Sequence, residues 1–248
     1  MKRMICIVMF AASVHAETPE QFFDLANQAY QQGMFAEAIE KYEMILQSGL
    51  VSGELYYNLG NAYYKAGNIG KAILNYERAR RMLPNDDDVL HNLQLVNLMI
   101  ADRIEPLPRV FLWDWWDGIT SWFSMNGITW TMYGVFLLTL VAGAAFMLAP
   151  TYALRRAAFI GVMVGVILFV GMLSVFLGKL GDLQRSDIAI VTADVATLKN
   201  SPDPKSTDAF VLHSGVKVFI TDKVKGWLKV RLADGKVAWI EQNTCEVI

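Results

Sequence analysis

Two long apolar runs without a charged residue constrain this chain more than any other feature. They lie within residues 127–149 and 157–178, and the short segment TYALRR follows the first run. Each run is about as long as a helix needs to cross the hydrocarbon core of a bilayer. With 54% hydrophobic and 19% charged residues, the composition also suits a chain that lies partly in lipid. The sequence therefore predicts two transmembrane helices joined by a loop at 150–156, rather than the buried hairpin of a soluble protein.

The first sixteen residues, MKRMICIVMFAASVHA, have a basic start, an apolar run and small residues at the end. This pattern is typical of a secretory signal peptide over 1–16, cleaved after Ala16; the alternative is an uncleaved anchor. Cleavage would remove Cys6 and leave Cys245 as the one cysteine of the mature chain. A lone thiol forms no internal disulfide, so we expect Cys245 to be a small buried side chain.

The charges beside the two apolar runs predict their orientation. The loop between them holds Arg155 and Arg156 and no acid, which is typical of a cytoplasmic loop. Both flanking regions then lie outside the cytoplasm, in agreement with the signal peptide. Gly161 and Gly165 form a GxxxG pattern that suits either packing against the first helix or a dimer contact. The absence of ionisable residues inside both runs argues against a transporter.

Between residues 19 and 86 the chain repeats itself with a period of 34. The recurring pairs are Leu25 and Leu59, Asn27 and Asn61, Tyr30 and Tyr64, Gly33 and Gly67, Ala38 and Ala72, Ile39 and Ile73, Tyr42 and Tyr76, and Glu43 and Glu77. The period, and the stretch LGNAYYKAGNIGKAILNYERARRMLPN, resemble the tetratricopeptide repeat. We therefore predict an all-α tetratricopeptide solenoid over 17–103, with repeats at 19–52 and 53–86. A helix at 87–103 should cap its open end.

The resemblance to tetratricopeptide repeats implies a concave groove that binds peptides or helices of partner proteins. The residues expected to line it are Phe23, Asn27, Tyr30, Tyr57, Asn61, Tyr64 and Lys65. The aromatic residues among them can instead serve the packing between repeats. Some members of the family clamp a C-terminal carboxylate with two asparagines and several basic residues. Asn27 and Asn58 match the asparagine positions, but Phe23, Asp88 and Asn92 occupy the basic ones. This substitution argues against that particular clamp.

Residues 113–122, WDWWDGITSW, hold four of the seven tryptophans of the chain. In a helix within 104–126, Trp115, Trp116 and Trp122 fall on one apolar arc, opposite the aspartates. Tryptophan is favoured where lipid meets water, and the segment lies directly before the first apolar run. We therefore predict a linker followed by an interfacial amphipathic helix. Docking of the apolar arc onto the repeat region is the alternative.

Residues 187–248 change to short segments of alternating polarity. The sequence ADGK is a hairpin turn between the runs WLKVRL and VAWI, so we predict a small all-β barrel. The stretches GWLKVRLADGKVAWI and TLKNSP resemble bacterial SH3-type domains, with Trp227 and Trp239 at the expected places. Such domains bind peptides or cell-wall material in other proteins. The two tryptophans either form a ligand platform or pack in the core.

Several classes of function find no support in the sequence. His15, His91 and His213 are scattered, and none stands at metal-ligand spacing to another ligand. No nucleophile arrangement, Walker pattern or dinucleotide loop is present. A net charge of −2 without a concentrated basic surface argues against nucleic acid. We therefore expect a non-enzymatic protein without a cofactor or a metal.

The order of a signal peptide, tetratricopeptide repeats, a tryptophan-rich helix, two spans and an SH3-type domain resembles the BatE-like proteins of the Bat (Bacteroides aerotolerance) group. The resemblance implies an operon shared with membrane-anchored von Willebrand A-type proteins and a MoxR-type ATPase. It also implies a role in envelope integrity or stress tolerance.

We therefore expect a scaffold or assembly protein of the inner (cytoplasmic) membrane, with both soluble domains on the periplasmic side. Its groove would bind partner proteins. One alternative is an envelope sensor or a peptidoglycan-binding protein that acts through the SH3-type domain. Another is an accessory subunit of a cell-wall hydrolase.

Overall fold

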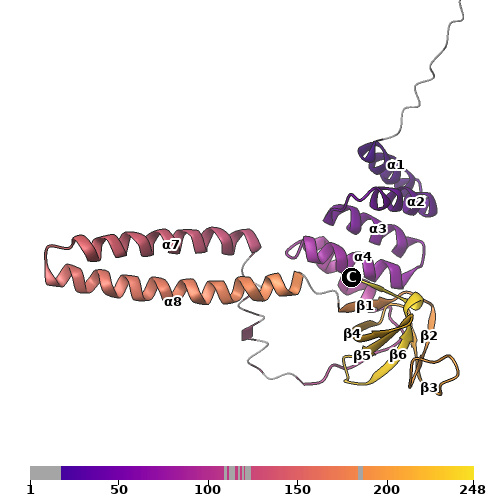
Figure 1. The fold of residues 1–248 in the computed structure, drawn as a ribbon. Helices are drawn as coiled ribbons and strands as arrows, with labels where there is room; N and C mark the ends of the chain where they lie inside the picture. The colour runs from indigo at the N-terminus through magenta and orange to yellow at the C-terminus, as the bar shows by residue number, and fades with distance from the viewer. Residues whose placement is uncertain are drawn as a thin grey trace, which may run out of the picture.

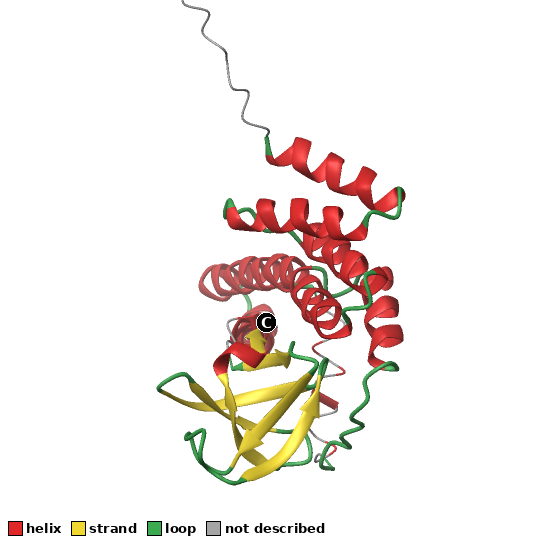
Figure 2. Cartoon of the chain, turned by 90° about the vertical axis from the view of Figure 1, so that its right-hand side faces the viewer, coloured by secondary structure: helices red, strands yellow, loops and turns green. Residues whose placement is uncertain are grey.

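The computed structural model describes residues 18–108, 111, 115, 116, 118, 120, 124–183 and 187–248. Figure 1 shows a stack of helices, a long helical hairpin and a small β-sheet domain. The stack lies above the sheet in both Figure 1 and Figure 2, and the hairpin extends away from them to the left of Figure 1. The chain thus combines an all-α repeat region, two long apolar helices and an all-β domain, as the sequence predicts.

The helices α1 to α5 form what we call the repeat domain. They are α1 (Pro19–Gln31), α2 (Phe35–Gln47), α3 (Gly53–Lys65), α4 (Ile69–Met82) and α5 (Asp87–Asn97). Four of them begin after a residue whose side chain accepts a hydrogen bond from a free backbone N–H of the first turn, namely Thr18, Ser52, Asn68 and Asp86. Helix α5 ends at Asn97 rather than at residue 103, because the chain turns there toward the sheet domain, against which Ile100 packs.

The turns inside the two repeats use the same chemistry. Gly33 follows α1 with φ 77° and Gly67 follows α3 with φ 80°, a backbone conformation that favours glycine. Ala38 and Ala72 are fully buried where the second helix of each repeat crosses the first. A larger side chain at either alanine would separate the helices, so the shared pattern of small residues sets the spacing of the stack.

Helices α7 (Met125–Leu148) and α8 (Tyr152–Leu183) form an antiparallel hairpin. Gly161 and Gly165 of α8 face α7, and a Cβ atom on Gly165 would overlap Thr139. The absence of these side chains lets the two backbones approach closely. Over their most apolar stretches only 0% and 11% of the two helices is buried. By length and composition, both helices can cross a membrane.

The connection between α7 and α8 is shorter than the loop at 150–156 that the sequence suggests. Helix α8 starts directly after Pro150 and Thr151, and the Thr151 hydroxyl accepts a hydrogen bond from the N–H of Leu154 at 3.4 Å. Arg155 and Arg156 therefore lie at the start of α8 and are exposed, instead of belonging to a loop.

Residues 187–248 form what we call the C-terminal domain. Its strands are β1 (Ile188–Val191), β2 (Val195–Lys199), β3 (Asp208–His213), β4 (Lys217–Val224), β5 (Trp227–Arg231), β6 (Val237–Glu241) and β7 (Cys245–Val247), with a 3-10 turn η1 (Gln242–Thr244) before the last. They form one antiparallel sheet in the order β3-β2-β6-β5-β4-β1-β7. Gly235, at φ 88°, makes the expected turn between β5 and β6. Strand β7 pairs with β1 alone and is one edge of the sheet.

The cores of the repeat domain and the C-terminal domain meet. Ile190 of β1 is fully buried within the apolar cluster of the repeat domain, and Ile248 packs against the same cluster. Ile100, in the segment after α5, packs against the cores of both domains. The two domains are therefore continuous through apolar contacts.

Candidate functional site

The residues that the sequence assigns to the groove come from α1 and α3. The structure leaves six of them half-buried and the seventh, Lys65, exposed; the six are Phe23, Asn27, Tyr30, Tyr57, Asn61 and Tyr64. Contacts join them within and between repeats. The ring of Phe23 meets Tyr42 edge-on at 5.9 Å, and that of Tyr57 lies 6.0 Å from Tyr76. Part of each aromatic surface thus serves the packing between helices.

A network of asparagines and tyrosines runs through the groove, and it repeats with the period of the sequence. The Tyr42 hydroxyl donates to Asn27 Oδ1 at 2.6 Å, and Asn58 Nδ2 donates to the same oxygen at 3.3 Å. One repeat later, Tyr76 donates to Asn61 Oδ1 at 2.7 Å, and Asn92 Nδ2 donates to it at 3.0 Å. We call these four asparagines, Asn27, Asn58, Asn61 and Asn92, the asparagine network.

The tyrosines of this network remain protonated donors. Burial, together with the nearby Tyr30, raises the pKa of Tyr42 to about 12. Burial raises the pKa of Tyr76 as well, and the neighbouring tyrosines add to the effect. Each hydroxyl therefore holds its asparagine oxygen in place at any pH near neutrality. The sequence did not single out Tyr42 and Tyr76 as groove residues, although their spacing of 34 marked them.

An open pocket of about 460 Å³ lies beside Phe23. Its apolar lining is Pro19, Phe23, Ile45, Leu50, Val51 and Leu55, and its polar residues are Glu20, Asp24 and Ser52. Leu50 and Val51 are half exposed, at 49% and 54% of their surface. The pocket thus combines a large accessible apolar surface with two carboxylates.

A second, closed surface joins α4 to the C-terminal domain. The Glu77 side chain is only 5% exposed; its carboxylate pairs with Lys217 of β4 and lies 2.7 Å from Arg80. Burial alone would raise the pKa of this carboxyl, but Lys217 and Arg80 outweigh it and leave the pKa below its usual value. Glu77 is therefore a carboxylate at neutral pH and links the two domains as an ion.

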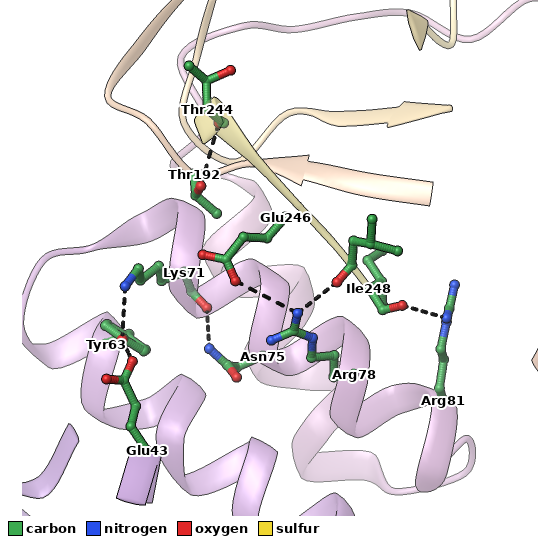
Figure 3. A network of polar contacts seen from close by, with 11 residues as sticks. Glu43, Tyr63, Lys71, Asn75, Arg78, Arg81, Thr192, Thr244, Glu246 and Ile248 are labelled. Atoms are coloured by element: carbon green, nitrogen blue, oxygen red, sulfur yellow. Dashed lines mark hydrogen bonds and ion pairs between the residues drawn. The ribbon is translucent and has the colours of Figure 1, made fainter. Parts of the chain in front are cut away.

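Two arginines of α4 hold the edge of the sheet, as Figure 3 shows. Arg78 donates to the main-chain oxygen of Val247 at 2.7 Å, and Arg81 donates to that of Ile248 at 2.8 Å. Arg78 also lies 3.8 Å from the Glu246 carboxylate. Carbonyls at a sheet edge lack a strand partner, so a helix that supplies donors to them covers that edge.

The helix α4 approaches the sheet closely at Gly70. A Cβ atom there would lie 2.9 Å from the carbonyl oxygen of Val191 and 3.0 Å from Cβ of Ser214. The segment after α5 adds a further contact, because Asp102 accepts a hydrogen bond from the N–H of His213 at 2.6 Å. No sequence pattern predicts this surface, since its residues come from segments far apart in the chain.

The two tryptophans of the C-terminal domain have different environments. Trp227 is buried and lines a shallow pocket of about 470 Å³, with Pro204 and Glu241 beside it. Trp239 is half-buried on β6, and the Lys229 ammonium lies 5.9 Å from its ring. The structure therefore does not bring the two rings together in one platform.

Two of the four tryptophans before α7 belong to the described residues. Trp115 is helical and 63% exposed, and Trp116 is helical and half-buried. Trp122 lies outside the described residues, as does most of the predicted amphipathic helix. Among the residues that the structure describes, no group of three or more His, Cys, Asp or Glu side chains could hold a metal ion.

Comparison with known families finds a match in the repeat domain and one in the C-terminal domain. Residues 53–86, which form α3 and α4, match the tetratricopeptide repeat, and residues 194–244 match the bacterial SH3 domain. A comparison with curated proteins found no significant match. The chain thus contains a tetratricopeptide repeat and a bacterial SH3 domain, neither of which is catalytic. A tetratricopeptide repeat implies protein partners.

Proposed function

We propose that this protein is a membrane-anchored scaffold that holds a partner protein in the groove of its repeat domain. The observation that carries the proposal is the exposure of α7 and α8. Exposed apolar side chains cover both helices along lengths that suit a bilayer, while the pocket of the repeat domain retains unfilled apolar and polar surface. Lipid is the environment that accommodates such helices, and a partner is what the repeat would bind.

The orientation we propose places both soluble domains outside the cytoplasm. Arg155 and Arg156, in the first turns of α8 next to the short connection between the helices, would stay on the cytoplasmic side, where such residues are enriched. The signal-peptide pattern of residues 1–16 supports the same orientation. In a bacterial cell this location is the periplasmic face of the inner membrane.

The partners we propose are other proteins of the same membrane. The order of domains resembles the BatE-like proteins, which implies von Willebrand A-type membrane proteins as partners and a role in envelope integrity or stress tolerance. Anchoring would confine the groove to a thin layer at the membrane surface, which raises the effective concentration of any partner anchored there. The polar and apolar contacts between α4 and the C-terminal domain would also keep both domains in one fixed geometry.

Site-specific photocrosslinking in intact membranes tests this proposal. A photoreactive residue at Lys65, which is exposed beside the groove, should capture a membrane protein. The matched control is the same residue at Glu40, which is exposed on α2. Equal capture at both positions, or none at Lys65, would reject the groove as the binding site. A cysteine at Lys236 should react with a membrane-impermeant maleimide from outside, whereas one at Arg156 should not; the reverse result would reject the orientation.

The pocket at Trp227 favours a second candidate, in which the C-terminal domain recognises cell-wall material as an envelope sensor or anchor. The pocket offers an indole surface, a proline and a carboxylate, which suits a small polar ligand with an apolar face. Sedimentation of the detergent-solubilised protein with purified peptidoglycan tests this candidate. If the protein sediments with peptidoglycan and free muropeptides prevent this, the result supports the candidate. If the protein does not sediment with peptidoglycan, the partner-binding scaffold remains as the one proposed function.

A further inference from the structure

The asparagine network leaves a defined set of polar atoms without an internal partner. Asn27 Oδ1 and Asn61 Oδ1 each accept two hydrogen bonds, so the Nδ2 donor of each side chain points away from those partners. Asn58 and Asn92 donate through Nδ2, which leaves Oδ1 of each as an uncommitted acceptor. Within the described residues, only Asn75 Oδ1 is a buried side-chain polar atom without a partner. The uncommitted atoms of the network are therefore at least partly accessible to solvent.

The network thus presents one donor next to one acceptor at two places. The first pair is Asn27 and Asn58, which are hydrogen-bonded to each other across the boundary between the two repeats, and the second pair is Asn61 and Asn92, which join the second repeat to α5. One residue of an extended peptide offers its own N–H and C=O on the same side of the chain. A donor and an acceptor held side by side can form hydrogen bonds with the C=O and the N–H of such a residue. These bonds do not depend on the identity of its side chain. The pattern fits the backbone of an extended segment.

The pocket beside Phe23 lies at one end of this network. Phe23 precedes Asn27 by one helical turn, and its ring packs on Tyr42, whose hydroxyl holds Asn27. The pocket volume of about 460 Å³ exceeds what a methyl or isopropyl group fills, and most of its lining is apolar. A large apolar side chain of a segment bound along the network would enter the pocket.

The charge at the pocket selects among such segments. Glu20 and Asp24 lie at its rim, and neither has an ion-pair partner among the described residues. The N-terminus of α1 contributes about half a positive charge, which the two carboxylates outweigh. A basic side chain next to the apolar one would therefore be attracted to this rim, and an acidic one would be repelled.

We propose that the groove binds an extended segment in which a large apolar side chain is flanked by a basic one. The asparagine network holds the backbone of the segment, and the pocket at Phe23 with Glu20 and Asp24 selects its side chains. This inference rests on the proposed function, because it names the kind of segment that a partner would place in the groove.

Binding of synthetic peptides to the full chain in detergent tests the inference. The probes are nine-residue peptides with blocked ends that carry one Phe or Leu flanked by Arg in a Ser and Val background. The first comparison set replaces Arg with Glu, and the second carries N-methyl groups on alternate backbone nitrogens. We expect the basic peptides to bind and both comparison sets to bind at least about tenfold more weakly. Equal binding of the acidic or the N-methylated peptides would overturn the proposal.

Matched variants of the protein separate the two parts of the site. The double variant Glu20→Gln, Asp24→Asn should weaken binding about fivefold to tenfold at low salt and reduce its salt dependence. The control Glu37→Gln, Glu40→Gln removes two acids from the equivalent turns of α2 and should leave binding unchanged. If the control weakens binding as much as the test variant, net charge and not the pocket is responsible, and the proposal fails.

The variant Asn61→Asp tests the backbone contact. An aspartate oxygen can still accept from Tyr76 and Asn92, so the internal network survives, but the uncommitted donor becomes an acceptor. We expect at least about a tenfold loss of affinity, although the added negative charge would by itself attract a basic peptide. Unchanged or tighter binding would overturn the role of the network. Crosslinking at Lys65 without binding of any peptide would reject this inference and keep the proposed function, whereas failure of the crosslinking would reject the function itself.

Discussion

Helices α2 and α4 occupy equivalent places in successive repeats, and they have different neighbours. Ala38 and Ala72 are fully buried in both repeats, and Tyr42 and Tyr76 donate to equivalent asparagines. Beyond these shared contacts α2 packs against the next repeat, whereas α4 packs against α5 and the C-terminal domain. The positions that the two helices share therefore build the repeat, and the positions that differ should show what α4 does in addition.

Three of the differences fall on contacts with the C-terminal domain. Gly70, Arg78 and Arg81 of α4 correspond to Ala36, Met44 and Gln47 of α2. The glycine allows the close approach of the sheet, and the arginines satisfy its edge. An end of a solenoid must be covered, because each repeat buries its apolar face against a neighbour. At α4 the C-terminal domain provides part of this cover.

The glutamates at equivalent positions of the two helices are the same residue type but have different neighbours. Glu43 of α2 accepts a hydrogen bond from Tyr63 of the next repeat, whereas Glu77 of α4 pairs with Lys217 of the C-terminal domain. One residue type at one repeat position thus serves two kinds of neighbour. Glu77 requires a charged partner because its carboxylate is almost fully buried.

The substitution Gly70→Ala gives α4 the residue that α2 carries at the equivalent position 36. It should have the largest effect on the docking of the C-terminal domain. In Gly70→Ala the new methyl group meets the carbonyl oxygen of Val191 in β1 and the Cβ atom of Ser214, and overpacking of this kind costs about 1–3 kcal/mol. The gain in helix propensity does not offset this cost, since it stabilises the docked and undocked forms equally. Cys245 is 6% exposed in the core of the C-terminal domain, on the edge strand β7 that α4 supports; loss of this support should let β7 fray from β1 and expose the thiol. Alkylation of that thiol in a Cys6→Ser background measures the opening.

The reverse exchange, Ala36→Gly, is the matched control for this prediction. Ala36 is exposed on α2, so its removal should weaken that helix and leave the alkylation rate of Cys245 unchanged. A Gly70→Ala protein with the parental alkylation rate would show that α4 does not hold the C-terminal domain.

Neutralising the buried carboxylate should have the next largest effect. Glu77→Gln removes the charge that faces Lys217 and Arg80. Those two side chains are 37% and 45% exposed and recover part of their hydration. We therefore expect a loss of about 1–2 kcal/mol of docking free energy, below the cost of an ion left fully buried. The accessibility of the Cys245 thiol measures this loss. The control Glu43→Gln keeps an acceptor for Tyr63 and should not change the accessibility of the thiol.

Acid should weaken the interface through the same carboxyl. The folded-state pKa of Glu77 lies below the ordinary value of 4.5, so the contribution of the ion pair is complete above pH 4.5 and is lost as the pH falls through the lower folded value. A pyridyl disulfide reacts with thiols at acidic pH and can follow Cys245 across this range. The difference between the parent and Glu77→Gln should disappear in acid; a constant difference would mean that Glu77 does not titrate there.

Exchanging the two arginines should have the smallest effect. Arg78→Met with Arg81→Gln gives α4 the side chains of α2 and removes one hydrogen bond to Val247 of β7 and one to Ile248, which follows β7. We expect a loss of about 1 kcal/mol, because the released main-chain oxygens can bind water. Hydrogen exchange of the β7 amides should rise. Met44→Arg, the reverse change on α2, is the control and should leave these amides as they are.

Most of the architecture could be predicted from the sequence because it depends on local patterns. The repeat period, the uncharged runs and the ADGK turn each describe residues that are close in the chain. The asparagine network could be predicted only in part. The 34-residue period indicated Asn27 and Asn61, but their hydrogen bonds to Tyr42 and Tyr76 depend on the packing of two helices. The start of α8 at Tyr152 was missed, because charge marks the sidedness of a loop and does not mark where a helix begins.

The sequence alone determined the kind of each part: a tetratricopeptide repeat, two long apolar helices and an SH3-type domain. Periodicity and composition specify these, since each element buries or exposes its own residues in a regular pattern. Only the tertiary structure decided how the parts meet. Glu77 and Lys217 are 140 positions apart, and neither forms part of a motif. Their pairing depends on the shapes of two folded domains, and only those shapes turn an exposed helix face and a sheet edge into one buried surface.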